Sequence, residues 1–252
     1  MADIRVGTSG WQYDDWDGTF YPDEVAKKRW YEHYATVFPT VEINYSFYRL
    51  PRGSTVEGWN RKAPDRFRYA IKGSRYITHN LKLGEGTDEA IGNVVGRLEP
   101  LKSFLGVWLW QLPPNLHRDV ERLDRFLGLL PGRHRHAVEF RHGSWFEDDV
   151  FEVLSRHGAA CVWISDRQMP DAYPVTADFV YVRFHGLSEQ EGERYRYDYS
   201  DEELRPWADR LLEQQAAGRD GWVYFNNDYQ ARAPQNALTL IEMLGDAAFD
   251  WP

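Results

Sequence analysis

The sequence has little sulfur and no long apolar run. Its 252 residues include one cysteine, Cys161, which excludes an intramolecular disulfide framework and a zinc site built from several cysteines. No run of about 18 apolar residues occurs, so we expect no membrane-spanning segment. The opening Met-Ala-Asp-Ile-Arg-Val-Gly lacks the charged-then-apolar pattern of a secretory signal, so we expect a cytoplasmic location and no contact with membranes.

Signatures of nucleotide-dependent enzymes are also missing. Neither G-x-G-x-x-G nor G-x-x-x-x-G-K-[ST] occurs, and the sequence identifies no cofactor. No linker rich in glycine and serine and no low-complexity tract interrupts the chain, so we expect a single domain over residues 1–252. The net charge of −9 argues against general coating of nucleic acid, although a locally basic cleft is compatible with it.

What the chain does contain is apolar material arranged in short runs. Hydrophobic residues make up 42% of it and aromatic residues 15%, which predicts a large core. Runs rich in Val, Ile, Phe, Tyr and Trp, typical of strands, alternate with stretches that have helical character. The expected strands are Ile4–Ser9, Thr40–Asn44, Phe67–Lys72, Leu105–Gln111, His136–Arg141, Ala159–Ser165, Phe179–His185 and Trp222–Asn227. The expected helices are Asp23–Phe38, Ser54–Lys62, Thr87–Ser103, Arg118–Leu130, Glu147–His157, Ser200–Gln215 and Ala233–Leu244.

Eight strands alternating with helices over about 250 residues predict an α/β fold, a (β/α)₈ TIM-like barrel. A doubly wound sheet is the alternative, but it usually has fewer strands. In such a barrel the chemistry is at the carboxyl ends of the strands. Each predicted strand ends in polar residues, and three polar pairs are two residues apart, so that both members face the same way. The pairs are Glu42 with Asn44, Glu139 with Arg141, and Arg183 with His185. The apolar residues between them, which we expect to pack against helices, are Ile43, Phe140 and Phe184.

These strand ends contain candidates for acid–base chemistry and for anion binding. Carboxylates and imidazoles can move protons, and fixed cations can clamp a phosphate or carboxylate. The candidate acids and bases are Glu42, Glu139, Asp166, His185 and His79. The candidate substrate-binding residues are Ser9, Trp11, Asn44, Lys72, Gln111, Arg141, Arg183, Asn226 and Asn227. We predict no metal site, because at least three cations compete with an ion for the acids.

Two other interpretations stay open. Buried Glu–Arg pairs at the strand ends can be a structural ion network that satisfies itself. Aromatic residues that follow the strands can stack on a base or a sugar ring, or can form a small core under the loops. These aromatic residues are Trp11, Tyr13, Trp16, Tyr45, Phe47, Tyr48 and Trp145. Cys161 lies in a strand between apolar neighbours, and we expect it to be a small core residue.

Several motifs resemble those of the YecE-like family. They are Gly7-Thr8-Ser9-Gly10-Trp11, Phe20-Tyr21-Pro22, Val41-Glu42-Ile43-Asn44, Ser46-Phe47-Tyr48-Arg49-Leu50-Pro51, Ile77-Thr78-His79, Gln111-Leu112-Pro113-Pro114, Glu139-Phe140-Arg141-His142, Tyr181-Val182-Arg183-Phe184-His185-Gly186 and Tyr224-Phe225-Asn226-Asn227-Asp228. They occur in order over nearly the whole chain. The resemblance implies a TIM-barrel fold but no activity, because the family is catalogued as a domain of unknown function. One departure is that the chain reads Tyr229-Gln230-Ala231 where we expect a glycine before the last helix.

These observations favour an enzyme, of hydrolase or lyase type, that acts on a polar anionic substrate at the carboxyl ends of the strands. Its partner would be a small-molecule or phosphate-bearing ligand. A nucleic-acid-binding or DNA-processing protein is one alternative, because cations and aromatic residues can hold phosphates and bases. A non-catalytic small-molecule binding protein is another. A carbohydrate hydrolase is a weaker alternative, because cations close to both Glu42 and Glu139 would hinder the acid role.

Overall fold

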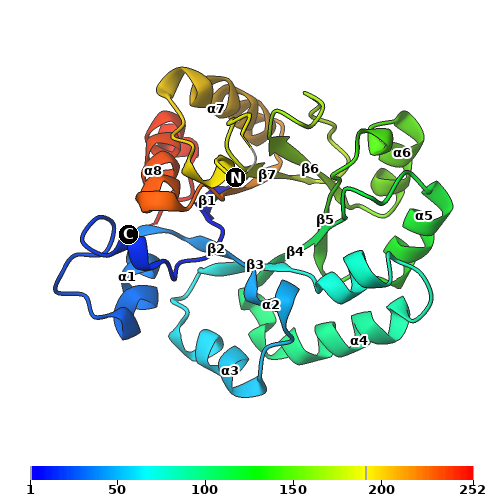
Figure 1. Cartoon of the computed structure of the whole chain (residues 1–252), viewed down its shortest axis with the longest axis horizontal. Coiled ribbons are helices and arrows are strands. Elements are labelled where there is room, and N and C mark those ends of the chain that lie inside the picture. Colours follow the sequence, from blue (N-terminus) through cyan, green and yellow to red (C-terminus); the bar gives the residue numbers. More distant parts are fainter. Residues whose placement is uncertain (1, 191, 252) are drawn as a thin grey trace. The chain divides into compact units, whose positions relative to one another are not determined.

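A computed structural model describes residues 2–190 and 192–251 and contains eight strands (Figure 1). The strands are β1 (Ile4–Thr8), β2 (Thr40–Ile43), β3 (Arg68–Lys72), β4 (Leu105–Gln111), β5 (Arg135–Glu139), β6 (Ala160–Ser165), β7 (Phe179–Phe184) and β8 (Asp220–Phe225). They follow one another in the sheet in the order β1-β8-β7-β6-β5-β4-β3-β2, and β8 pairs in parallel with both β1 and β7. Strands β3, β4, β5 and β6 also pair in parallel. The predicted (β/α)₈ TIM-like barrel is confirmed, with every expected strand present.

The helices between the strands follow the predicted pattern, and their ends differ from the predicted ones by at most seven residues. They are α1 (Trp30–Val37), α2 (Tyr45–Tyr48), α3 (Gly53–Lys62), α4 (Thr87–Leu98), α5 (Val120–Leu129), α6 (Asp148–Arg156), α7 (Asp201–Ala216) and α8 (Arg232–Leu244). The sequence does not predict α2, a single turn. The predicted helix Thr87–Ser103 ends at Leu98, because Pro100 and a left-handed Lys102 (φ +51°) turn the next segment into 3₁₀ structure. Within residues 2–190 and 192–251, no helix is both long enough and apolar enough to cross a membrane.

Local signals in the sequence account for two helix starts. The Ser200 hydroxyl accepts the Glu203 backbone N–H (3.3 Å), and the Glu203 carboxylate accepts the Ser200 N–H (2.9 Å), so the predicted capping box starts α7. Asp119 caps α5 by accepting the Arg122 N–H at 3.0 Å.

The chain divides into two compact units, each built from separate segments. Unit 1 consists of Met1–Glu42, Ile164–Gln168 and Asp178–Pro252, and unit 2 consists of Ile43–Trp163 and Met169–Ala177. That residues 1–252 form a single domain stays a prediction.

In unit 1, aromatic side chains join the strands to the helix that covers them. Phe184 of β7 stacks on Phe225 of β8, with ring centroids 4.3 Å apart, and its edge contacts Trp207 of α7. Helices α7 and α8 lie beside each other (Figure 1). This packing fulfils the expectation that Phe184 faces a helix, and it fixes the opposite orientation for Arg183 and His185.

The core of unit 2 contains stacked tryptophans and a histidine whose two ring nitrogens both form hydrogen bonds. Trp108 and Trp110 of β4 stack with centroids 5.5 Å apart. The Trp110 Nε1–H donates to Nδ1 of His136 (3.2 Å), so the neutral ring carries its proton on Nε2, which donates to the Pro131 carbonyl (3.1 Å). Burial lowers the pKa of His136 to about 4. Cys161 is buried, as expected, and burial raises the pKa of its thiol to about 12.

The buried, hydrogen-bonded His136 predicts that the protein loses stability in acid. The pKa of His136 falls from 6.5 in the unfolded chain to about 4 in the folded one, so the unfolded state binds more protons between these values. The free energy of unfolding therefore decreases as the pH falls through this window, by about 2 kcal/mol from pH 7 to pH 4.5 for this group. Urea unfolding should show that His136→Gln removes this part of the acid sensitivity. His117→Gln, at an exposed histidine, should keep the acid sensitivity of the natural chain, and equal curves for both variants would contradict the assignment.

Gly186 in unit 1 occupies a position where a side chain has no room. Its φ is +91°, and a Cβ there would lie 2.1 Å from the carbonyl oxygen of Arg194. Gly192 also has a positive φ (+88°), but a Cβ there would meet nothing within 4 Å. Comparing substitutions at the two glycines therefore distinguishes the effect of backbone strain, present at both, from that of steric overlap, present only at Gly186.

We expect Gly186→Ala to destabilise the protein by clearly more than Gly192→Ala. The second variant adds only the left-handed strain of alanine, about 1 kcal/mol. The first adds that strain and displaces the Arg194 backbone. Free energies of unfolding from urea titrations check this, and similar values for the two variants would mean that the chain segment around Arg194 gives way without cost.

Candidate functional site

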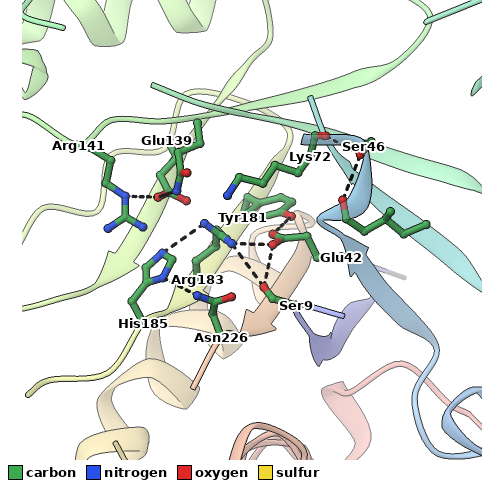
Figure 2. A network of polar contacts seen from close by, with 12 residues as sticks. Ser9, Glu42, Ser46, Lys72, Glu139, Arg141, Tyr181, Arg183, His185 and Asn226 are labelled. Carbon is green, nitrogen blue, oxygen red and sulfur yellow. Dashed lines mark hydrogen bonds and ion pairs between the residues drawn. The ribbon is translucent and has the colours of Figure 1, made fainter. Parts of the chain in front are cut away.

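Unit 1 has a buried polar network at the carboxyl ends of its strands (Figure 2). Glu42 of β2 lies at its centre. Its Oε1 accepts hydrogen bonds from the Ser9 hydroxyl (2.7 Å) and from Nη2 of Arg183 (2.6 Å). Its Oε2 accepts one from the Tyr181 hydroxyl (2.7 Å). Glu42 is 0% exposed and Arg183 1% exposed, so this is a fully buried ion pair with neutral donors around it.

Tyr181 retains its proton in this environment. Burial, and then the negative charge of Glu42, hold the pKa of its hydroxyl well above its usual range. The hydroxyl therefore donates to Glu42 at any physiological pH. With these donors on both oxygens, the carboxylate of Glu42 is held in one orientation.

The other side of the Arg183 guanidinium faces His185. Nη1 of Arg183 lies 3.3 Å from Nε2 of His185. A guanidinium can only donate, so Nε2 accepts and a neutral ring carries its proton on Nδ1. Nδ2 of Asn226 lies 3.2 Å from that Nδ1. Turning the side-chain amide by 180° exchanges its nitrogen and oxygen, and the oxygen then accepts the Nδ1 proton. Predicted residues Ser9, Glu42, Arg183, His185 and Asn226 are thus brought together in one connected network (Figure 2).

Three further predicted residues of unit 1 make contacts with other segments. Asp166 accepts from Nη1 of Arg194 (2.7 Å) and from the Gln168 N–H (3.0 Å). Asn227 donates to the Tyr197 carbonyl (2.8 Å) and to Oδ1 of Asn236 in α8 (2.7 Å). Both therefore anchor the segment that precedes α7. Trp11 is nearly buried and contacts Tyr31 of α1 edge to face, with ring centroids 5.4 Å apart.

Asp228, which follows the end of β8, is not among the residues predicted for the site. Its carboxyl oxygen Oδ1 is buried and has no hydrogen-bond partner among the described residues. Burial raises the pKa of this carboxyl to about 8. The only sequence signal for it is the run Asn226-Asn227-Asp228. The two asparagines are predicted to bind substrate, whereas an aspartate after a strand is also typical of a solvent-exposed loop.

Unit 2 has a polar cluster of its own. Oε1 of Glu139 accepts from Nε2 of Gln111 (2.6 Å) and from Nε of Arg141, so the predicted pair Glu139–Arg141 forms an ion pair on β5 (Figure 2). The Lys72 ammonium lies 4.2 Å from the ring centroid of Phe47. Glu139 is 0% exposed. Roles of Gln111, Glu139 and Arg141 in binding or catalysis stay predictions.

His79 and Asn44 also belong to unit 2. Nδ1 of His79 shares a hydrogen bond with the Thr78 hydroxyl (2.8 Å). Burial, followed by the charges of Lys72 and Arg75, lowers the pKa of His79 to about 4, so the ring is neutral at pH 7. Asn44 precedes α2, and its buried Oδ1 has no partner within the described part of the chain. In the described ranges 2–190 and 192–251, no three His, Cys, Asp or Glu side chains group as a metal site.

The interpretation of the aromatic residues as exposed stacking surfaces is wrong for Trp16 and Trp145, which are 0% exposed. The indole N–H of Trp16 donates to the Asp228 carbonyl (2.7 Å), and that of Trp145 donates to the Leu116 carbonyl (2.7 Å). These tryptophans form small cores beneath the loops, the alternative considered above. Tyr48, by contrast, is 71% exposed.

Comparisons with known proteins agree with the fold. Residues 5–251 match the family model described as "Protein of unknown function DUF72". The UPF0759 protein YunF of Bacillus subtilis is 27% identical over 270 residues, covering 96% of this chain and 94% of YunF. The UPF0759 protein YecE of Escherichia coli K12 is 31% identical over 149 residues, covering 57% of this chain and 54% of YecE.

Solved structures give the same result. A DUF72 family protein from Thermotoga maritima superposes with a TM-score of 0.86 and 34% identity, covering 96% of this chain and 99% of that one. A DUF72 family protein from Enterococcus faecalis has a TM-score of 0.82 at 21% identity over 99% of this chain and 98% of that one, which supports the fold alone. The resemblance to the YecE-like family is confirmed, and the chain belongs to the DUF72 family.

Proposed function

We propose that the protein is an enzyme of hydrolase or lyase type that performs acid–base chemistry on a small polar substrate with an anionic group, such as a phosphate. The observation that carries this proposal is the buried Glu42–Arg183–His185 network. A buried ion pair contributes little net stability, because its desolvation cost offsets the attraction between the charges. In TIM-barrel enzymes the carboxyl ends of strands are where the chemistry occurs, and β2 and β7 supply this network there.

Arg183 is the proposed electrostatic group. Glu42 and Ser9 hold Nη2, and His185 accepts from Nη1, so the guanidinium has a fixed orientation before a substrate arrives. A cation that is already oriented stabilises developing negative charge without reorganisation in the transition state. In this arrangement Glu42 positions Arg183. Its carboxylate is occupied by donors from three residues and is a poor candidate for a base.

His185 is the proposed base. Its Nε2 lone pair points at Nη1 of Arg183. A substrate anion that accepts the hydrogen bond from Nη1 leaves the Nε2 lone pair available to accept a proton from the substrate or from water. The hydrogen bond between Nδ1 and Asn226 holds the ring in place during this exchange.

The proposal includes the cytoplasmic location that the sequence leads us to expect.

The proposed role of Glu42 predicts a large effect of Glu42→Gln on stability. The substitution removes the carboxylate that pairs with the buried Arg183 charge, so we expect a loss of about 3–5 kcal/mol in the free energy of unfolding, measured by urea titration. Glu121→Gln removes an exposed partner of Arg125 (3.8 Å) and should cost less than about 1 kcal/mol. A cost for Glu42→Gln as small as that for Glu121→Gln would mean that the buried pair does not hold the structure.

The function itself is tested by binding and turnover on the whole chain. Calorimetric titration with inorganic phosphate at low ionic strength should show binding, and Arg183→Gln should weaken it at least tenfold. Incubation with phosphate monoesters, phosphate diesters and 2-hydroxy acids, followed by NMR, should show turnover of at least one class. His185→Asn should reduce that turnover by about 100-fold or more, the usual contribution of a general base.

The matched control is Arg205→Gln, which removes an exposed arginine of α7 and should leave binding and turnover unchanged. Phosphate binding without turnover of any class would favour the alternative, a non-catalytic binding protein. Binding of single- or double-stranded oligonucleotides, strongly weakened by salt and without binding of free phosphate, would favour a nucleic-acid partner. Either outcome contradicts the proposed enzyme.

A further inference from the structure

The loops that follow β4 and β5 in unit 2 are joined to each other. The two strands pair in parallel, so both loops leave the same end of the sheet (Figure 1). The indole N–H of Trp145, after β5, donates to the carbonyl of Leu116, after β4 (2.7 Å). Nη1 of Arg118 lies 3.3 Å from Oδ1 of Asp149, in the first turn of α6. The loops are thus held together at the carboxyl ends of the strands, where TIM-barrel enzymes perform their chemistry.

The hydroxyl of Ser144 connects these two loops. Its oxygen accepts the backbone N–H of Arg118 (3.0 Å) and lies 2.8 Å from Nδ1 of His142. The same Nδ1 accepts the backbone N–H of Ser144 (3.2 Å). A ring nitrogen that accepts from an amide carries no proton, so the neutral ring of His142 has its proton on Nε2. The Ser144 hydroxyl is therefore the donor in its contact with Nδ1, and its proton points at a base.

Capping of a short helix accounts for only part of this arrangement. His142 is the N-cap of the 3₁₀ turn Gly143–Trp145, and the hydrogen bond from the Ser144 N–H is sufficient for that role. The hydroxyl contact is additional, and so is the amide of Arg118, which comes from the other loop. A serine hydroxyl that donates to an imidazole while an amide N–H donates to its oxygen has the contacts of an activated nucleophile.

A second histidine orients the base. The ring of His142 stacks on that of His117, with centroids 4.0 Å apart and planes 20° apart. The stack and the Ser144 amide together hold the imidazole, as the third group of a catalytic triad does. A proton taken up by His142 makes its ring a cation, which the face of a neutral aromatic ring stabilises. His142 and Ser144 are half-buried and His117 is exposed, so the pair is partly open to solvent.

We propose that Ser144 is a nucleophile and His142 its general base, in a site of unit 2 that hydrolyses carboxylic esters. The Ser144 oxygen bonds to the ester carbonyl carbon, and its proton passes to Nδ1. The bond from that carbon to the alcohol oxygen breaks, and this oxygen keeps the electron pair and takes the proton from Nδ1. Water then attacks the acyl-serine and gives a proton to Nδ1, which returns it to the Ser144 oxygen as the acyl group leaves. One ester and one water yield one acid and one alcohol.

This site is independent of the function proposed above. Its residues all belong to unit 2, whereas the Glu42–Arg183–His185 network belongs to unit 1. Failure of the phosphate experiments would leave the serine site unaffected, and failure of the experiments below would leave the anion site unaffected.

The first test uses the natural chain and a fluorophosphonate. The Ser144 oxygen should bond to phosphorus as fluoride leaves with the electron pair of its bond, and peptide mass spectrometry should find the adduct on Ser144. Ser155, an exposed serine of α6 whose hydroxyl donates to the Phe151 carbonyl (2.8 Å), is the internal control and should stay unlabelled. An unlabelled Ser144, under conditions that label a serine esterase in parallel, overturns the proposal. Equal labelling of Ser144 and Ser155 also overturns it, because it would mean general surface reactivity.

The second test separates the base from the cap. His142→Asn keeps a side chain that can cap the 3₁₀ turn but removes the imidazole, so the labelling rate of Ser144 should fall by about 100-fold or more. An unchanged rate would mean that His142 only caps the turn, and the proposal would fail.

The third test measures turnover of 4-nitrophenyl acetate by the release of 4-nitrophenol. The natural chain should hydrolyse this ester faster than buffer does, and Ser144→Ala should lower kcat by about 100-fold or more. The matched control Ser155→Ala should leave kcat unchanged. Hydrolysis no faster than in buffer, or hydrolysis that persists in Ser144→Ala, overturns the proposal.

Discussion

The buried ion pair of Glu42 and Arg183 is the interaction on which unit 1 depends. Both side chains are almost completely removed from water, and each charge is stabilised by the other, 2.6 Å away. Ser9 and Tyr181 add donors to the carboxylate, and His185 accepts from the guanidinium. Residues that follow or belong to β1, β2 and β7 are therefore joined by electrostatics as well as by the sheet.

The ion pair also influences groups at a distance. The charge of Glu42 raises the pKa of Tyr181 and of Asp228, while the charge of Arg183 lowers both. A low-dielectric interior makes such effects larger than they are at a surface. Because burial adds to them, the Tyr181 hydroxyl retains its proton, and the pKa of the Asp228 carboxyl rises to about 8. The same buried charges thus explain both the fixed orientation of the network and the pKa shifts of Tyr181 and Asp228.

Much of the fold follows from the sequence because its signals are local. Alternating apolar runs predict every strand, and a capping box predicts the start of α7. The two-residue spacing of Arg183 and His185 predicts that they share a face, and the network between them agrees. The helix Thr87–Ser103 is too long in the prediction, because periodicity alone does not register the effect of Pro100 on the last turn.

The sequence by itself determined the barrel class, the strand ends and the residue types gathered at them, since periods of two and of 3.6 residues can be recognised without knowing what packs where. Only the tertiary structure decided which of these polar groups form hydrogen bonds or ion pairs with other segments. It turned Asp166 and Asn227 toward neighbouring segments, buried Trp16 beneath a loop, and buried one carboxyl oxygen of Asp228. The physical reason is that desolvation and hydrogen-bond pairing depend on atoms that are distant along the chain. The sequence identifies the ionisable groups, but the fold determines how deeply each is buried and therefore its protonation state.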